Sequence, residues 1–263
     1  MTIDHKTIRK IANFTAILAA FGTNIAANLN PINGLTIGEI SNTLFKDVLI
    51  TPANYAFAIW GLIYLGLFSF AVYQALPQQK NNALLDRIGY LLVLSSAAQI
   101  VWVFAFLSRS FLLSLLAMFA ILLSLIISYY RLQIGKKRIS SRDKWFIQIP
   151  VSIYLAWISV ATVVNVAIVL YNWNWNGWGI EPQIWSGIVL LLAGILVTIV
   201  ALVRRDLAFV FVYIWAFLAI SIRHLDKPII FITAGLLSLL LLILVMFTLA
   251  RRRKSVAFID RTS

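Results

Sequence analysis

Long apolar runs separated by short polar segments dominate the chain. Eight such runs can be recognised, at about 8–29, 53–76, 87–107, 110–130, 146–171, 184–203, 207–222 and 228–250. Most of them are long enough for a helix to cross the roughly 30 Å hydrocarbon core of a bilayer. The run at 207–222 is the shortest and gives a helix of only about 24 Å. The pattern predicts an all-α, polytopic membrane helix bundle with about eight transmembrane helices.

Composition and charge agree with a membrane protein. Hydrophobic residues make up 62% of the chain and charged residues only 12%, whereas a soluble protein is about a quarter charged. The net charge of +13 would indicate nucleic-acid binding in a soluble protein. Here the basic residues flank apolar runs, as the positive-inside rule requires. We therefore expect the lipid bilayer as partner, and no nucleic acid.

The distribution of basic residues predicts the orientation in the membrane. With the N-terminus in the cytoplasm, all Lys and Arg residues fall on the cytoplasmic side except Lys46, Arg109, Arg223 and Lys227. Both termini are then cytoplasmic, and a bacterial-type plasma membrane is expected. The first run resembles a signal peptide, but it is longer than a usual apolar core and shows no clear cleavage site. It is interpreted as the first span.

Several kinds of chemistry are disfavoured by the residues that are scarce. The chain has no Cys, which excludes disulfides and thiolate chemistry, and its two His residues, His5 and His224, lie outside the apolar runs. No ionisable Asp, Glu, Lys, Arg or His lies deep in a run, which argues against a proton-coupled pump and against acid–base catalysis. We expect neither enzymatic activity nor a required cofactor, although a tryptophan-radical or photochemical route stays open.

Two loops on the non-cytoplasmic side are unusual. Residues 171–185 read YNWNWNGWGIEPQIW and contain four of the nine tryptophans. An aromatic belt at the headgroup level is the favoured interpretation, and a lid over a ligand is the alternative. The loop 30–52 combines turn residues with many apolar ones. We expect it to pack back onto the bundle and to cover a site.

Amide and aromatic side chains recur at helical spacing inside four runs. These faces carry Asn13, Asn24 and Asn28; Phe57, Trp60 and Tyr64; Gln99, Trp102 and Phe106; and Tyr154, Trp157, Ala161 and Asn165. Because a buried amide in lipid needs a partner, the faces should point into the bundle. They either form hydrogen bonds between helices, worth about 0.6–2 kcal/mol each, or line a pocket for an aromatic ligand.

At these residues the sequence resembles the TspO/MBR family, the tryptophan-rich sensory proteins and translocator proteins. The family's second-helix pattern is roughly P-x-W-x-F-x-x-V-W-x-x-L-Y, and residues 52–64 read PANYAFAIWGLIY. Its fifth-helix pattern is P-Y-x-x-W-x-x-x-A-x-x-x-N. Tyr154, Trp157, Ala161 and Asn165 match it in full, and Pro150 lies nearby. In the third helix Gln99 replaces the family's Asn, and the first family Trp of the second helix is replaced by Asn54 or Tyr55.

The resemblance covers about residues 1–172. It implies a ligand-binding five-helix core at 1–172, followed by three additional helices and a basic tail at 173–263, in a longer, divergent member. It also implies a membrane sensor whose ligand is a tetrapyrrole (porphyrin or haem) or a similar flat apolar molecule. The candidate ligand-binding residues are Tyr55, Trp60, Tyr64, Gln99, Trp102, Phe106, Tyr154, Trp157, Ala161 and Asn165.

Two alternatives stay open. The first is a transporter of small amphipathic molecules, since eight spans suffice for one. The second concerns assembly: a homodimer could form through close helix contacts at Gly61, Gly66, Gly187 and Gly194.

Overall fold

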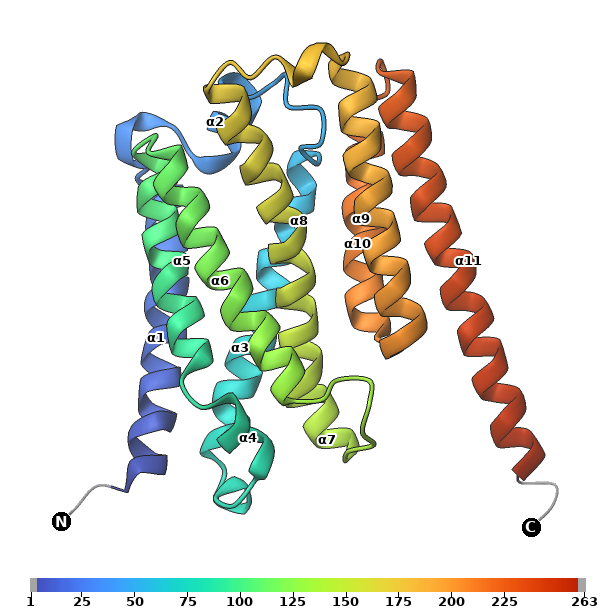
Figure 1. Cartoon of the computed structure of the whole chain (residues 1–263). Coiled ribbons are helices and arrows are strands. Elements are labelled where there is room, and N and C mark those ends of the chain that lie inside the picture. Colours follow the sequence, from blue (N-terminus) through green and yellow to red (C-terminus); the bar gives the residue numbers. More distant parts are fainter. Residues whose placement is uncertain (1–3, 260–263) are drawn as a thin grey trace.

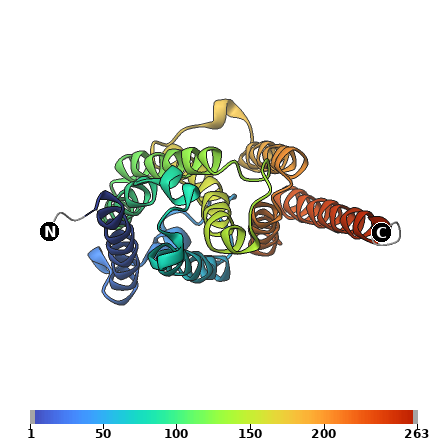
Figure 2. The same ribbon diagram turned by 90° about the horizontal axis from the view of Figure 1, so that it is seen from below.

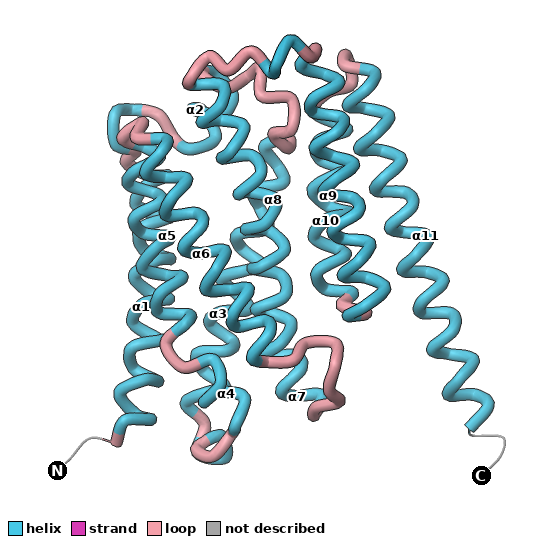
Figure 3. The backbone as a smooth tube through the Cα atoms, viewed as in Figure 1, coloured by secondary structure: helices cyan, strands magenta, loops and turns pink. Residues whose placement is uncertain are grey.

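The protein folds as a bundle of long helices that run roughly side by side (Figures 1 and 3). The computed structural model describes residues 4–259, with side chains up to residue 250, and no strand occurs in this part of the chain. The long helices are α1 (His5–Leu29), α3 (Ile59–Ala75), α5 (Leu91–Leu107), α6 (Phe111–Arg131), α8 (Ile149–Asn172), α9 (Pro182–Arg204), α10 (Leu207–Arg223) and α11 (Pro228–Ile259). The predicted all-α bundle is confirmed.

Each predicted apolar run coincides with one of these helices. Within the described residues, five segments are long and apolar enough to cross a bilayer, namely Asn54–Ala75, Phe111–Arg131, Ser141–Asn172, Pro182–Arg204 and Pro228–Ala250. Helices α5 and α10 are apolar but shorter. The protein is therefore an integral membrane protein by composition and helix length, while the count of eight crossings stays a prediction.

One predicted run begins too early. Residues 87–90 belong to the short helix α4 (Ala83–Ile88) and to the turn that follows it, and α5 starts only at Leu91. Gly89 has a φ of +58° in this turn, a conformation that interrupts a right-handed helix. The apolar character of the segment is continuous, so hydrophobicity alone did not reveal the break.

The core is continuous from the first helix to the last. Helices α1, α3, α5, α6 and α8 pack on one another, and α10 packs on α8, while α11 packs on α9 and α10. Figure 2 shows the last three helices gathered on one side of the first five. Tyr213 of α10 is fully buried, and its hydroxyl lies 2.8 Å from that of Ser159 on α8. A single cluster of buried side chains thus extends across residue 172, and the predicted domain division there stays a prediction.

The turn between α9 and α10 carries charge into the interior. Arg204 and Asp206 are both buried. The hydroxyl of Ser152 on α8 donates to Asp206 (2.7 Å), and the Arg204 guanidinium lies 4.9 Å from the ring centroid of Tyr130. The sequence placed these residues at the edge of an apolar run, where they would face water. Instead the turn docks against α6 and α8.

Candidate functional site

A small cavity lies between α3, α5, α6 and α8. Its volume is about 40 Å³. Six of the ten predicted ligand-binding residues line it: Trp60, Trp102, Phe106, Trp157, Ala161 and Asn165. They come from three different helices, and each helix turns the face that the 3.6-residue period predicted toward the same point. The cavity is lined almost entirely by apolar and aromatic groups, with one buried amide among them.

That amide, Asn165, is fixed by its neighbours. Its carbonyl oxygen accepts the indole N–H of Trp102 on α5 (3.1 Å), and the hydroxyl of Ser114 on α6 lies 3.4 Å from the same oxygen. Its own N–H donates to the carbonyl of Ala161 one turn earlier (3.0 Å). Three helices therefore meet at Asn165. A polar group held in this way is already oriented before any ligand arrives.

Three further candidates form a hydrogen-bonded chain instead of lining the cavity. The hydroxyl of Tyr154 donates to the side-chain carbonyl of Gln99, whose amide donates to the hydroxyl of Tyr64 (3.1 Å). Tyr64 in turn donates to the carbonyl of Ala20 on α1 (3.1 Å). The ring of Trp60 lies 5.8 Å from that of Tyr64 and 6.0 Å from that of Tyr154. This row of hydrogen bonds therefore lies directly behind the cavity wall and joins the four helices α1, α3, α5 and α8. As ligand contacts, these three residues stay predictions.

The long loop after α1 forms a lid over the cavity. The lid contains α2 (Ile37–Thr43), and four of its residues line the cavity: Ile37, Ser41, Thr51 and Pro52. The predicted packing of this loop on the bundle is confirmed, because Phe45, Val48 and Ile50 are also buried in the core. These lid residues and Met118 of α6 were not among the candidates. The apolar character of the loop pointed to the lid as a whole, but nothing in the sequence singled out Met118.

A capping box holds the start of the lid helix. The backbone N–H of Thr36 donates to the Glu39 carboxylate (2.7 Å), and the Thr36 hydroxyl accepts the N–H of Glu39 (3.3 Å). The Thr36 hydroxyl also donates to the Glu39 carboxylate (2.8 Å). The backbone N–H and the hydroxyl of Thr36 together lower the pKa of Glu39 below its usual value. Two donors that a helix start leaves unpaired are satisfied in this way, so the short helix has a defined beginning.

Comparison with known families agrees with this geometry. The family model for TSPO-like proteins matches residues 10–247. The chain belongs to the TSPO-like protein family. The match extends through α10 and most of α11, well beyond residue 172, where the recognised motifs end. A search of curated proteins and a search of solved structures found no match.

In this TSPO-like protein the lid is fastened by α10. Arg223, at the end of that helix, donates to the side-chain carbonyl of Asn42 (2.9 Å) and to the backbone carbonyls of Pro52 and Ser41 (both 3.2 Å). The imidazole Nε2 of His224 donates to the carbonyl of Thr51 (3.3 Å). Burial, followed by the neighbouring charge of Arg223, lowers the pKa of His224. No pattern in the sequence indicates this fastening.

Tyr55 has a different place from the one predicted. Its side chain is 40% exposed, and its ring lies 5.2 Å from that of Trp215 on α10, outside the cavity lining. The indole N–H of Trp215 donates to the carbonyl of Ala56 (3.1 Å). This pair secures the 3₁₀ turn η2 (Asn54–Ala58) that leads from the lid into α3.

The tryptophan-rich loop between α8 and α9 folds on itself. The rings of Trp175, Trp178 and Trp185 lie 5.4–5.7 Å apart. None of the loop's tryptophans lines the cavity. Trp178 and Trp173 are 75% and 59% exposed, as an aromatic belt requires. Residues 30–52 of the TSPO-like chain, and not the tryptophan loop, therefore cover the cavity, and the tryptophan loop fits the belt interpretation.

None of the residues that line the cavity is an Asp, Glu, Lys, Arg or His. In the part of the chain that the structure describes, no group of three or more His, Asp or Glu residues is arranged to hold a metal ion. The chemistry on offer at the cavity is therefore aromatic stacking and hydrogen bonding.

Proposed function

We propose that this TSPO-like membrane protein binds a flat aromatic molecule of the tetrapyrrole class in the cavity beneath the lid, and that it acts as a sensor or carrier of that ligand. The observation that supports the proposal most directly is the convergence of Trp60, Trp102 and Trp157. Three indoles from three helices line one cavity, together with one oriented amide, Asn165.

This arrangement suits a large planar ligand. Indole rings offer broad apolar faces for stacking, with favourable offset or edge-to-face geometry. A ligand site is typically apolar with a few placed polar groups that fix the orientation. Asn165 can supply that orientation, since its position is set by contacts from α5 and α6. A tetrapyrrole presents both an apolar plane and polar nitrogens or carboxylates to such a site.

The cavity must enlarge before it can take this ligand. Its volume of about 40 Å³ is far below the roughly 300–1,000 Å³ of ligand pockets. We infer that the lid is the wall that moves, because it is a connecting segment. Beside its buried apolar contacts at Phe45, Val48 and Ile50, only a few polar contacts at Arg223 and His224 attach it to α10. We infer that the closed form is the resting state, and that ligand binds a form in which the lid has moved away.

The test is a titration of the protein in nanodiscs with protoporphyrin IX and with haem, monitored through the ligand's own absorbance. We expect a saturable shift, and at least about a five-fold weaker affinity in Trp157→Ala, corresponding to about 1 kcal/mol of lost stacking. Trp173→Ala removes an exposed indole in the outer loop and is the matched control. Circular dichroism checks that each variant is folded.

Two further measurements complete the test. Ala161→Leu fills the void instead of enlarging it, so it blocks the site even if Trp157→Ala fails to fold. Normal binding by folded Trp157→Ala and Ala161→Leu would show that the ligand binds elsewhere. If no tetrapyrrole gives a saturable shift, counterflow of labelled amphipathic substrates in proteoliposomes tests the transporter alternative.

A further inference from the structure

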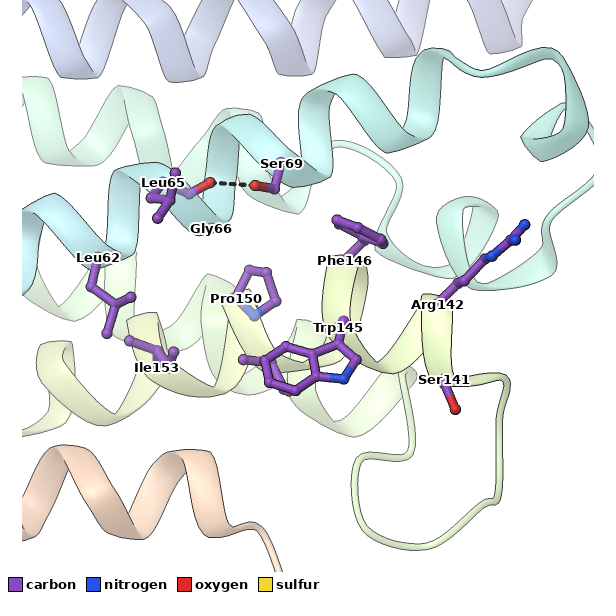
Figure 4. Close-up of a pocket in the computed structure, with 11 residues that line it drawn as sticks. Leu62, Leu65, Gly66, Ser69, Ser141, Arg142, Trp145, Phe146, Pro150 and Ile153 are labelled. Atoms are coloured by element: carbon purple, nitrogen blue, oxygen red, sulfur yellow. Dashed lines mark hydrogen bonds between the residues drawn. The ribbon is translucent and has the colours of Figure 1, made fainter.

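A second, larger cavity opens on the flank of the bundle. It has a volume of about 430 Å³ and lies between α3 and the segment formed by α7 (Ser141–Asp143), the π turn η4 (Lys144–Gln148) and the start of α8 (Figure 4). It shares no lining residue with the cavity beneath the lid. We call it the flank groove. Its walls include Leu62 and Leu65 on one side and Ile153 on the other.

The backbone shapes this groove. At its floor Gly66 lies against Pro150, and a Cβ on Gly66 would come within 3.2 Å of the Pro150 Cβ. The π turn then changes the direction of successive side chains. Phe146 stacks on Tyr73, with ring centroids 5.0 Å apart, and stays 38% exposed, while Trp145 is 65% exposed at the rim. The groove is therefore built by rigid contacts rather than by a loose loop.

The two ends of the groove differ in polarity. Leu62, Leu65 and Ile153 surround one end, and Ser141 and Arg142 lie at the other (Figure 4). In the part of the chain that the structure describes, no carboxylate lies within 4.0 Å of the Arg142 guanidinium. An arginine without a carboxylate partner at the end of an apolar groove is complementary to a molecule with an apolar tail and an anionic head.

The place of the groove identifies that molecule as a lipid. Both walls belong to segments apolar and long enough to span a bilayer, and Leu65 is exposed on the outer surface of α3. The polar end lies toward the end of the bundle at which α1 begins and α11 finishes (Figure 1). Trp145, which is exposed three residues after Arg142, carries the side chain that prefers the level between hydrocarbon and headgroups.

We propose that the flank groove binds one anionic phospholipid, with its phosphate at Arg142 and an acyl chain along Leu62, Leu65 and Ile153. The volume is in the range of ligand sites. Basic residues near a membrane surface attract anionic lipids, and the groove adds an apolar channel that confines a single lipid next to that charge. This site is independent of the tetrapyrrole proposal.

Native mass spectrometry of the detergent-purified full chain tests the assignment, because it counts bound lipids and protein copies together. The probes are dioleoyl phosphatidylglycerol and dioleoyl phosphatidylcholine. We expect one saturable lipid with about a five-fold preference for phosphatidylglycerol, as for one basic residue at a headgroup. Arg142→Glu should remove the preference. Ser69 is half-buried on the groove wall. Ser69→Trp therefore places a large side chain in the groove and should block binding of both lipids.

The matched control is Arg138→Glu, which makes the same charge change at an exposed site in the preceding loop, outside the groove. It should keep the preference. Equal binding of the two lipids by the wild type would overturn the site. An equal loss of the phosphatidylglycerol preference in Arg142→Glu and Arg138→Glu would also overturn it, because the preference would then come from diffuse attraction to surface charge. A dimer that Ser69→Trp converts to a monomer, with lipid binding unchanged, would assign the groove to a second copy of the chain instead.

Discussion

Arg223 donates a hydrogen bond of 2.9 Å to the side chain of Asn42, a residue that precedes it by 181 positions. Two more bonds from the same guanidinium reach the carbonyls of Ser41 and Pro52. Ser41 and Pro52 also line the cavity beneath the lid. A single side chain from α10 therefore ties the roof of the candidate site to the C-terminal part of the bundle. In this way α10 helps to hold the lid in place.

Arg223→Ala should loosen the lid. Hydrogen bonds from a charged donor contribute about 1.5–3 kcal/mol each. We expect amide exchange across residues 37–52 to become at least about ten-fold faster, which corresponds to 1.4 kcal/mol. Hydrogen–deuterium exchange with mass spectrometry measures this. Lys46→Ala removes the same charge from an exposed place on the lid and should leave amide exchange unchanged. Equal exchange rates in the two variants would contradict the fastening role of Arg223.

Acid should also loosen the lid, through His224. Burial and the adjacent Arg223 lower its pKa in the closed form, so the closed form favours neutral imidazole. An open form that exposes the ring regains a pKa near 6.5 and binds the proton more readily. By linkage the closed form is fully favoured above about pH 6.5 and loses stability as the pH falls below that value.

The test for His224 is the rate of amide hydrogen exchange across residues 37–52 at pH 7.5 and at pH 5.5, corrected for the intrinsic pH dependence of exchange. The other charged groups nearby are Arg223, Asp226 and Lys227. The pKa of Asp226 is itself lowered, mainly by its hydrogen bond with Lys227, so it stays ionised over this range. His224→Gln should abolish the pH effect. An unchanged pH effect in that variant would place the titrating group elsewhere.

Periodicity predicted the helices and seven of the fifteen residues that line the cavity, because these depend on local pattern. The face of Tyr154, Trp157, Ala161 and Asn165 does point into the bundle. Periodicity gives the direction of a side chain but not its level along the helix axis. Tyr154 lies below the cavity and Asn165 beside it, and only the packing of four helices decides that. The pairing of Arg223 with Asn42 left no local signal at all, since nothing near either residue indicates the other.

Tyr154→Phe should destabilise the bundle without affecting the cavity directly. The change leaves the buried carbonyl of Gln99 without its donor, at a cost of about 1–3 kcal/mol. Thermal unfolding in detergent should show a lower midpoint. Tyr90→Phe, at an exposed tyrosine, is the control. If the midpoint is unchanged while ligand affinity falls, Tyr154 acts as a ligand anchor, as the family resemblance implied, and not as a link between helices.

Gly135 is a position where any side chain should disrupt the fold. Its φ is +76°, and a Cβ would lie 1.8 Å from the carbonyl oxygen of Arg204. Gly34 has a nearly identical φ of +77° but nothing within 4 Å. Gly34→Ala therefore incurs only the backbone penalty of about 1–2 kcal/mol. Gly135→Ala adds the clash and should undock the buried α9–α10 turn, which a much larger fall in thermal midpoint would reveal. Equal falls in thermal midpoint for the two variants would mean that the α6–α7 connection shifts to relieve the clash at little cost.

The absence of Cys allows the orientation to be tested directly. Lys137→Cys lies in the α6–α7 connection and Asn176→Cys in the tryptophan loop, and each creates the chain's only thiol. Because basic loops stay in the cytoplasm, a membrane-impermeant maleimide on intact cells should label Asn176→Cys and spare Lys137→Cys. Permeabilised cells should label both, which controls for burial of the thiol. The reverse labelling would invert the topology, place the lid on the cytoplasmic side, and mean that ligand enters the cavity from within the cell.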